Sequence, residues 1–192
     1  MKKAYLVRHG QTRYNQEGRC QGWANSPLTM LGKQEAAWTA RHLREEGIAF
    51  DHAYSSDAGR ALETLQILLA GQEVPAFASA GLREMHFGDY DGKSWEEFPQ
   101  DIDMATFFSS AGGETYEEAI LRVFRTIAGL LAQEDNETIL VVSHGAVLSG
   151  IYDALPKKPD RARPEQFGNG CVITLAADGE QYWIEDYWQP EP

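Results

Sequence analysis

The stretch Ala4-Tyr5-Leu6-Val7-Arg8-His9-Gly10 has a counterpart late in the chain, Ile139-Leu140-Val141-Val142-Ser143-His144-Gly145. In each stretch a short apolar run, of the length of a buried strand, is followed by a histidine and then a glycine. Glycine permits a sharp turn and a close approach of a ligand. Ligands of open α/β sheets bind beyond the carboxyl ends of the strands, so the two histidines are candidate site residues.

Around these stretches, short apolar runs alternate with longer segments of helical period. This pattern predicts an α/β fold in three layers, with a mostly parallel sheet and helices on both of its faces. The predicted strands are residues 3–7, 51–54, 138–142, 171–175 and 181–184, and the predicted helices are 29–46, 57–71, 115–131 and 146–155. The pair Asp178-Gly179 predicts an antiparallel hairpin between the last two strands, at the edge of the sheet.

Length and composition exclude several classes of protein. The chain has 192 residues, and 17 Lys and Arg against 29 Asp and Glu give a formal net charge of −12. This length suits a single domain over residues 1–192, and the acidic balance argues against nucleic acid as a partner. No apolar run reaches the roughly 18 residues that cross a bilayer, and the amino terminus is too polar for a signal peptide. We therefore expect a cytoplasmic protein without a membrane partner, whose two cysteines are reduced.

Residues 86–113 fit the strand and helix pattern least well. They mix glycine, serine, proline and aromatic residues. We expect this segment to be a cap or lid over the surface of the domain.

One further predicted strand and one apolar stretch lead to charged residues. Ser55-Ser56 follow the strand 51–54, and Arg60 then lies in the first turn of a helix, where backbone N–H groups favour an anion. Leu82-Arg83-Glu84 brings a carboxylate after an apolar stretch. The candidate catalytic residues at the strand ends are Arg8, His9, Arg60, Glu84 and His144.

These residue types together can transfer a phosphoryl group without a metal. An imidazole attacks phosphorus and holds it covalently, which divides one difficult displacement into two easier ones. Guanidinium groups match phosphate oxygens, and a carboxylic acid can protonate the leaving alkoxide and then deprotonate water. We expect Arg8, Arg60 and a protonated His144 to supply the positive charge that a metal would otherwise provide.

Each candidate also has a purely structural interpretation. A lone histidine at a strand end is commonly a structural or surface residue, and Arg60 and Glu84 taken singly are ordinary solvent-facing side chains. The two equivalent His-Gly exits favour the catalytic interpretation. The sequence has no motif for a nucleotide-binding loop, a zinc protease or a serine nucleophile elbow, so we expect no cofactor and no metal.

The stretch Arg8-His9-Gly10-Gln11-Thr12-Arg13-Tyr14-Asn15 resembles the R-H-G-x-T-x-x-N signature of the histidine phosphatase superfamily, the phosphoglycerate-mutase-like proteins. The resemblance extends over nearly the whole chain. Further landmarks follow in the order of that family: Gln21-Gly22, Pro27-Leu28-Thr29, Gly32, Ser55-Ser56, Arg60-Ala61, Thr64, Leu82-Arg83-Glu84, Phe87-Gly88, Asp91-Gly92, Gly112-Gly113-Glu114-Thr115 and Ser143-His144-Gly145.

The resemblance implies a role for each matching residue. His9 would be the nucleophile that becomes phosphohistidine, and Arg8 and Arg60 would hold the phosphoryl oxygens. His144 would donate a hydrogen bond to the same group in the transition state, and Glu84 would be the general acid and then the base. The implied phosphate and substrate contacts are Gly10, Thr12, Asn15, Gln21, Gly22 and Gly145. The family needs no metal.

Members of this family are mainly mutases, which return the phosphoryl group to the bound product, or phosphatases, which give it to water. Mutases acting on phosphoglycerates carry extra basic residues after the catalytic glutamate. Between His86 and Gly113 this chain has only Lys93, among many acidic and aromatic residues. We therefore expect a phosphatase acting on a small phosphomonoester, with His86 either contacting the substrate or facing solvent.

Two alternatives stay open at this point. One is a phosphoglycerate-type mutase, and the other is a non-catalytic protein that binds a phosphorylated ligand. The second would be expected to have lost His9, Glu84 or His144, and all three are present. The sequence is compatible with a monomer or a homodimer.

Overall fold

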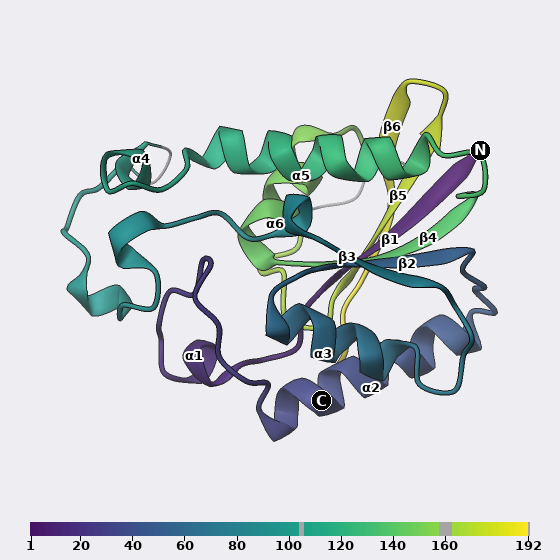
Figure 1. Ribbon diagram of the computed structural model, residues 1–192, viewed down its shortest axis with the longest axis horizontal. Coiled ribbons are helices and arrows are strands. Elements are labelled where there is room, and N and C mark those ends of the chain that lie inside the picture. The colour runs from purple at the N-terminus through teal and green to yellow at the C-terminus, as the bar shows by residue number, and fades with distance from the viewer. Residues whose placement is uncertain (104–105, 158–162, 192) are drawn as a thin grey trace.

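A mixed β-sheet forms the centre of the molecule (Figure 1). The structure, a computed structural model, describes residues 1–103, 106–157 and 163–191. In this part of the chain, six strands lie in the order β3-β2-β4-β1-β5-β6. The strands are β1 Lys2–Arg8, β2 His52–Ser56, β3 Ala76–Ser79, β4 Thr138–Ser143, β5 Val172–Asp178 and β6 Gln181–Trp188. Strands β3, β2, β4 and β1 are parallel, β5 is antiparallel to β1, and β6 is antiparallel to β5. The predicted α/β class, the mostly parallel sheet and the edge hairpin are confirmed.

Helices cover both faces of the sheet. The helices are α1 Arg13–Gln16, α2 Met30–Glu45, α3 Gly59–Leu68, α4 Phe107–Ser110, α5 Tyr116–Leu131 and α6 Gly145–Ala154. In Figure 1, α5 and α6 lie on one side of the sheet, and α2 and α3 lie on the other. None of the helices in the described ranges is long and apolar enough to cross a lipid bilayer.

Strand β4 shows why both faces are covered. Successive side chains of a strand point to opposite faces of the sheet. Ile139 and Val141 belong to the core beneath α5 and α6, whereas Leu140 and Val142 belong to the core beneath α2 and α3. All four side chains are fully buried. An uninterrupted apolar run is therefore typical of a central parallel strand.

Two features of the fold were not predicted. Strand β3, at the edge of the sheet, has mostly exposed side chains, so its sequence lacks an apolar pattern. Helix α1 is only four residues long and is held by Thr12, which accepts a hydrogen bond from Asn15 N. Such short elements depend on local capping and on their neighbours, and periodicity cannot reveal them.

The expected cap segment, residues 86–113, contains three short helices in its described part, η2 Gly88–Tyr90, η3 Trp95–Glu97 and α4. Its aromatic side chains pack on one another, with Phe108 completely buried and its ring 4.7 Å from that of Phe87. Aromatic clustering explains why the segment follows no strand or helix period: its side chains pack around each other rather than along one face.

Candidate active site

Strand pairing brings together the two His-Gly pairs that follow β1 and β4. Strands β1 and β4 are parallel neighbours, and Arg8 pairs with Ser143 in their register. Consequently His9 and His144 both follow the carboxyl ends of adjacent strands, and their rings meet edge to face with centroids 5.2 Å apart. The two candidate histidines therefore lie side by side at the same edge of the sheet.

His9 is buried, and its hydrogen bonds define its tautomer. Nδ1 lies 2.8 Å from the carbonyl oxygen of Gly10, which can only accept, so Nδ1 carries the proton. Nε2 therefore carries the unprotonated lone pair of the ring, and it accepts a hydrogen bond from Arg60 Nε at 3.3 Å. Burial, followed by the charges of Arg60 and Arg8, lowers the pKa of His9 well below its usual value. The imidazole is thus neutral at neutral pH, as a nucleophile must be.

The backbone of His9 is held on both sides. Asn169 Nδ2 donates to the His9 carbonyl at 2.9 Å, and Gly10 N donates to Thr64 Oγ1 at 3.1 Å. A Cβ on Gly10 would lie 2.2 Å from the carbonyl oxygen of Gly32, so glycine is needed for this close packing of two loops. Gly10 therefore supports the turn after β1 and does not line the cavity described below.

Arg60, in the first turn of α3, is only 1% exposed. Its Nη1 donates to the Ala24 carbonyl at 2.7 Å, and its Nη2 donates to the Gly22 carbonyl at 2.8 Å. Burial lowers the pKa of Arg60 to about 10, which still leaves the guanidinium charged at neutral pH. The loop of residues 22–24 thus fixes a buried cation beside His9.

His144 is fully buried and lies 3.0 Å, through Nδ1, from Arg60 Nη2. Arginine has no acceptor, so Nδ1 accepts and the proton of the neutral ring sits on Nε2. Burial, followed by the charges of Arg60, His9, Arg8 and Arg122, lowers the pKa of His144 well below its usual value. The expectation of a protonated His144 is therefore wrong for the free site, because burial, and then the neighbouring guanidinium groups, disfavour a positive charge on this ring.

Two buried donors beside His9 have no partner in the described part of the chain, Arg8 Nε and His144 Nε2. An unpaired buried donor costs about 1–3 kcal/mol, so native proteins rarely keep one without a reason. Glycine at position 145 allows the Arg8 side chain to lie close to the backbone there, since a Cβ on Gly145 would lie 2.9 Å from Arg8 Nε. An anion with several oxygen atoms would satisfy both donors.

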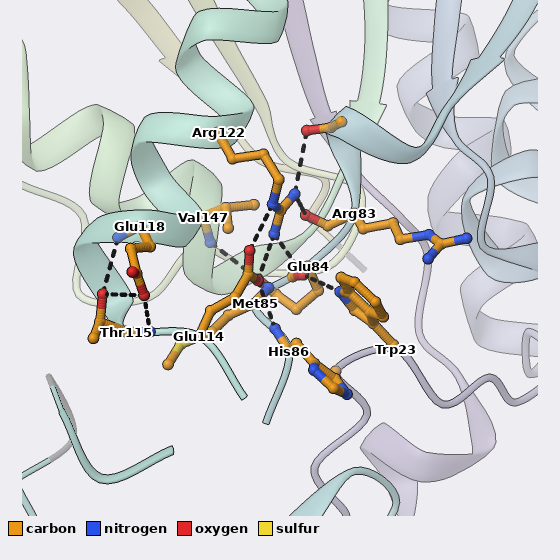
Figure 2. A network of polar contacts seen from close by, with 12 residues as sticks. Trp23, Arg83, Glu84, Met85, His86, Glu114, Thr115, Glu118, Arg122 and Val147 are labelled. Carbon is orange, nitrogen blue, oxygen red and sulfur yellow. Dashed lines mark hydrogen bonds and ion pairs between the residues drawn. The ribbon is translucent and has the colours of Figure 1, made fainter. Parts of the chain in front are cut away.

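Glu84 lines the same cavity as Arg8 and His9, and it is 8% exposed. Its carboxylate accepts hydrogen bonds from the backbone N–H groups of Met85 at 3.0 Å, Ala146 at 3.0 Å and Val147 at 3.2 Å. Figure 2 shows Glu84 with Met85 and Val147. Helix α6 has no side-chain cap from its own N-cap residue, His144, so Glu84 supplies that cap from a distant part of the chain.

A cavity of about 770 Å³ opens at these residues. The predicted site residues that line it are Arg8, His9, Asn15, Gln21, Gly22, Arg60, Glu84 and Gly145. Thr12 lies behind this wall and accepts a hydrogen bond from Gln21 Nε2 at 2.7 Å. Gly22, with φ of +50°, leaves room for Asp91, whose Oδ1 would lie 1.8 Å from a Cβ at this position.

The structure does not place His86 on the wall of this cavity. Its ring stacks on that of Trp23 with centroids 4.3 Å apart, and its Nε2 is 3.4 Å from Asp91 Oδ2. The expectation that His86 contacts the substrate is therefore not supported by its position, because its ring stacks on Trp23 and its Nε2 is directed to Asp91.

Several cavity residues were missed by the sequence reasoning. The additional lining residues are Arg19, Cys20, Met85, Phe87, Trp95, Tyr116, Ala146, Ser149, Arg163, Glu165, Gln166 and Phe167. They come from five separate segments, and no motif joins them. Glu114 and Trp23 do not line the cavity, but they make hydrogen bonds to the backbone around Glu84 that no sequence pattern indicates.

The thiol of Cys20 is a further potential nucleophile on the cavity wall. A thiol becomes reactive as the thiolate. Burial and the nearby carboxylates of Asp91 and Glu84 raise the pKa of Cys20 well above its usual value. The thiol therefore stays protonated, and His9 is the group that carries an available lone pair.

The described residues include no group of three or more His, Cys, Asp or Glu side chains arranged to hold a metal ion. The charged residues that line the cavity are Arg8, Arg19, Arg60, Glu84, Arg163 and Glu165. This arrangement suits an anionic ligand whose oxygens face guanidinium groups.

The two buried neutral histidines predict a fall in stability with acidity. Both pKa values lie below 6.5 in the folded protein, whereas the unfolded chain titrates near 6.5. Their contribution is therefore fully present above about 6.5 and is lost as the pH falls toward the lowered folded values, by up to about 1.4 kcal/mol per pH unit for each histidine. Urea unfolding at about pH 7 and about pH 5.5 measures this slope.

The matched control for this prediction is the double variant His9→Gln/His144→Gln. Glutamine does not titrate, so the variant should show a clearly shallower slope over the same interval. An equal slope in both proteins would mean that these histidines are not the titrating groups.

Comparisons with known proteins place this geometry in context. A family model for the histidine phosphatase superfamily, branch 1, matches residues 4–189. The chain is 29% identical over 199 residues to "Probable phosphoglycerate mutase GpmB" of Salmonella paratyphi B, over 100% of this chain and 92% of that protein. It is similar to the solved structure of YhfR from Bacillus stearothermophilus, with a TM-score of 0.84, 30% identity, and 96% of this chain and 95% of that chain covered. It is also similar to a mutant phosphoserine phosphatase from Entamoeba histolytica in complex with phosphoserine, with a TM-score of 0.77, 28% identity, and 97% and 96% of the two chains covered.

Proposed function

We propose, on the premise that this chain belongs to the histidine phosphatase superfamily, that it hydrolyses small phosphomonoesters through a phosphohistidine formed on His9. The observation that carries the proposal is the pair of unpartnered buried donors, Arg8 Nε and His144 Nε2, beside a neutral imidazole. A phosphoryl group held by these donors would meet the lone pair of His9 Nε2.

In the first step, the lone pair of His9 Nε2 forms a bond to phosphorus as the bond to the leaving oxygen breaks. The electron pair of that bond stays on the leaving oxygen, which takes a proton from Glu84. Arg8, Arg60 and the Nε2–H of His144 stabilise the negative charge on the phosphoryl oxygens.

In the second step, the Glu84 carboxylate takes a proton from water, and the oxygen of that water bonds to phosphorus. The electron pair of the P–N bond returns to His9 Nε2, so the imidazole is neutral again and phosphate leaves. One residue thus acts first as the acid and then as the base.

Some of the surrounding residues would contact the substrate, and others hold those residues in place. We assign Asn15, Gln21 and the Gly22 backbone to phosphate or substrate contact, because they line the cavity. Thr12 orients Gln21, and Gly10 and Gly145 permit the close approaches described above.

Hydrolysis rather than mutase activity is favoured by what the segment 86–113 brings to the cavity. Its lining residues in the described part of the chain are the aromatic Phe87 and Trp95. Lys93, its basic residue, lies over the ring of Tyr90 at 4.5 Å. A second anionic group of a phosphoglycerate would therefore find no basic partner in this segment.

A phosphoglycerate-type mutase is the second candidate function. Arg19 and Arg163 line the cavity from other segments, and this observation favours it. Each of them already has an acidic partner, since Arg163 Nε is 2.7 Å from Asp153 Oδ1 and Arg19 Nη1 is 3.6 Å from Glu17 Oε2. Paired guanidinium groups attract a further anion less strongly.

Incubation with 3-phosphoglycerate separates the two functions. We expect released phosphate as the main product, because water rather than a bound glycerate accepts the phosphoryl group. Isomerisation to 2-phosphoglycerate faster than phosphate release would establish the mutase instead. Comparison of kcat/KM over sugar phosphates, phosphoserine and nucleoside monophosphates would then rank the substrates.

We also predict that turnover is independent of metal ions. The guanidinium groups of Arg8 and Arg60 supply positive charge at the phosphoryl group. Extensive treatment with EDTA should therefore leave kcat unchanged. An activity that disappears with EDTA and returns with magnesium or zinc would contradict the proposed mechanism.

We place the protein in the cytoplasm and treat residues 1–192 as one domain with the segment 86–113 as its cap. Cys20 and Cys171 are buried free thiols, as expected in a reducing compartment. Packing of Phe87 and Phe108 into the core beneath α5 supports a cap that is part of the domain.

A further inference from the structure

The backbone around Glu84 belongs to no helix or strand. Residues 83–87 are irregular, so their peptide groups need hydrogen-bond partners from elsewhere. Arg122, on helix α5, supplies two of them: Nη1 donates to the carbonyl of Arg83 at 2.9 Å, and Nη2 donates to that of Glu84 at 3.1 Å. Its Nη1 also donates to the carbonyl of Gly81, just before this segment, at 3.2 Å. Figure 2 shows this guanidinium between Glu84 and Glu114.

Glu114 binds both Arg122 and the backbone that follows Glu84. Its two carboxylate oxygens accept from Arg122 Nε and Nη2, both at 2.7 Å. The oxygen facing Nη2 also accepts from the backbone N–H of His86 at 2.9 Å. The pair therefore binds the chain both at Glu84 and two residues after it, and this leaves little freedom for the peptide that carries the Glu84 side chain.

The electrostatics and burial of the pair suit a fixed position. The side chains of Arg122 and Glu114 are 24% and 21% exposed. Burial alone would raise the pKa of Glu114, but the hydrogen bonds from Arg122 and His86 bring this pKa below its usual value. The carboxylate is therefore ionised at neutral pH, and the bidentate ion pair is maintained.

Helix α5 is a rigid base for this arrangement. Val123 and Ile127, next to and about one turn after Arg122, are fully buried against the sheet. Trp23 Nε1 reaches the same Glu84 carbonyl from the opposite side at 2.9 Å. One peptide group is thus held by two side chains from different elements.

We propose that Arg122, with Glu114 as its partner, is a positioning residue that sets the distance of the Glu84 carboxyl from the leaving oxygen. This inference rests on the proposed function, in which Glu84 is the general acid. Proton transfer needs hydrogen-bond reach, and a displacement of about 1 Å can cost on the order of 10²-fold in rate. Neither Arg122 nor Glu114 lines the cavity, so the pair acts on it only through the backbone around Glu84.

A second ion pair provides a matched control. Arg83 Nε and Nη2 donate to Asp57 Oδ1 and Oδ2, both at 2.6 Å, so this pair is also bidentate and close to Glu84 in sequence. Asp57 accepts no hydrogen bond from the backbone of residues 84–87 among those described. Asp57→Asn therefore weakens an ion pair of the same kind without releasing the Glu84 peptide.

The test measures single-turnover phosphorylation of His9 by glycerol 2-phosphate and by p-nitrophenyl phosphate. Glycerol leaves as a basic alkoxide that needs an acid, whereas p-nitrophenolate leaves unprotonated. The double variant Glu114→Gln/Arg122→Gln removes both charges, so it leaves no unpaired buried ion. We expect phosphorylation by glycerol 2-phosphate to slow about 10–100-fold and that by p-nitrophenyl phosphate to change little, with Asp57→Asn close to wild type for both.

Chemical rescue gives a second readout. Arg122→Ala should regain part of its rate with glycerol 2-phosphate when guanidinium ion is added, because the ion can occupy the vacated position. If circular dichroism shows that the double variant is unfolded, Arg122→Lys carries the test with the same two substrates, since lysine keeps the charge but cannot form the fork.

The outcomes distinguish this inference from the proposed function. Equal slowing with both substrates, or no slowing with either, in a folded variant would overturn the positioning role. Wild type and Glu84→Gln are measured alongside. If wild type forms no phosphohistidine, the proposed function itself fails whatever the Arg122 variants do. If Glu84→Gln shows no difference between the substrates, the proposed role of Glu84 as the general acid fails, and the positioning role fails with it.

Discussion

Replacing His9 by alanine should abolish both phosphoenzyme and turnover, with kcat lower by on the order of 10⁴-fold or more, as is typical when a covalent nucleophile is removed. The reason is geometric and electronic. His9 Nε2 carries a lone pair and lies beside the two unpartnered donors, Arg8 Nε and His144 Nε2. The neutral imidazole needs no deprotonation before it attacks phosphorus. Quenching a reaction with a labelled phosphomonoester measures the intermediate, which should be labile in acid and stable in base.

Two variants control for the identity of the labelled residue. His42 stacks on Trp188 with ring centroids 4.0 Å apart and does not line the cavity, so His42→Ala should keep the label. Cys20→Ser should keep it as well, because the Cys20 thiol is protonated. Undiminished label on His9→Ala, or no label on wild type, would exclude His9 as the nucleophile.

The second large effect concerns Glu84 and depends on the leaving group. Glu84→Gln should slow phosphorylation of His9 by about 10²–10⁴-fold with alkyl phosphates, whose alkoxides must be protonated as they leave. With p-nitrophenyl phosphate the loss should be far smaller. Single-turnover phosphorylation must be measured, because loss of the base also slows the attack of water on phosphohistidine and would mask the contrast in kcat.

Arg60→Ala is the contrasting variant for this experiment. Arg60 lies beside His9 and His144 and acts on the phosphoryl group itself, so its loss should slow both substrates alike. If Glu84→Gln also slowed both equally, Glu84 would be a structural or binding carboxylate, and the proton would have to come from another group at the cavity.

The two histidines could be predicted because each follows an apolar run that is long enough for a buried strand. Parallel pairing of two such strands then brings their ends together, and this is a general property of α/β sheets. Glu84 was predicted as a carboxylate after an apolar stretch, and the resemblance then implied its role. Periodicity could not place it further, since residues 83–87 form no regular element.

Burial of Arg60 could not be predicted from its own helix. An arginine in a first helical turn is ordinarily solvated, and here it is buried because a separate loop provides the carbonyls of Gly22 and Ala24. Glu114 illustrates the same limit. Its position before α5 is explained by the helix dipole alone, but its carboxylate in fact pairs with Arg122, eight residues later. Such contacts depend on tertiary packing that periodicity does not encode.

The position of β1 in the sheet has a consequence for how the protein folds. Its two neighbours are β4 and β5, which come from the opposite end of the chain. During synthesis the first strand therefore emerges long before either partner exists, and it cannot pair until nearly all of the domain has left the ribosome. Such non-local pairing slows folding, since the loop between the partners must close first. His9, the proposed nucleophile, directly follows this strand. It therefore acquires its surroundings in one of the last events of folding.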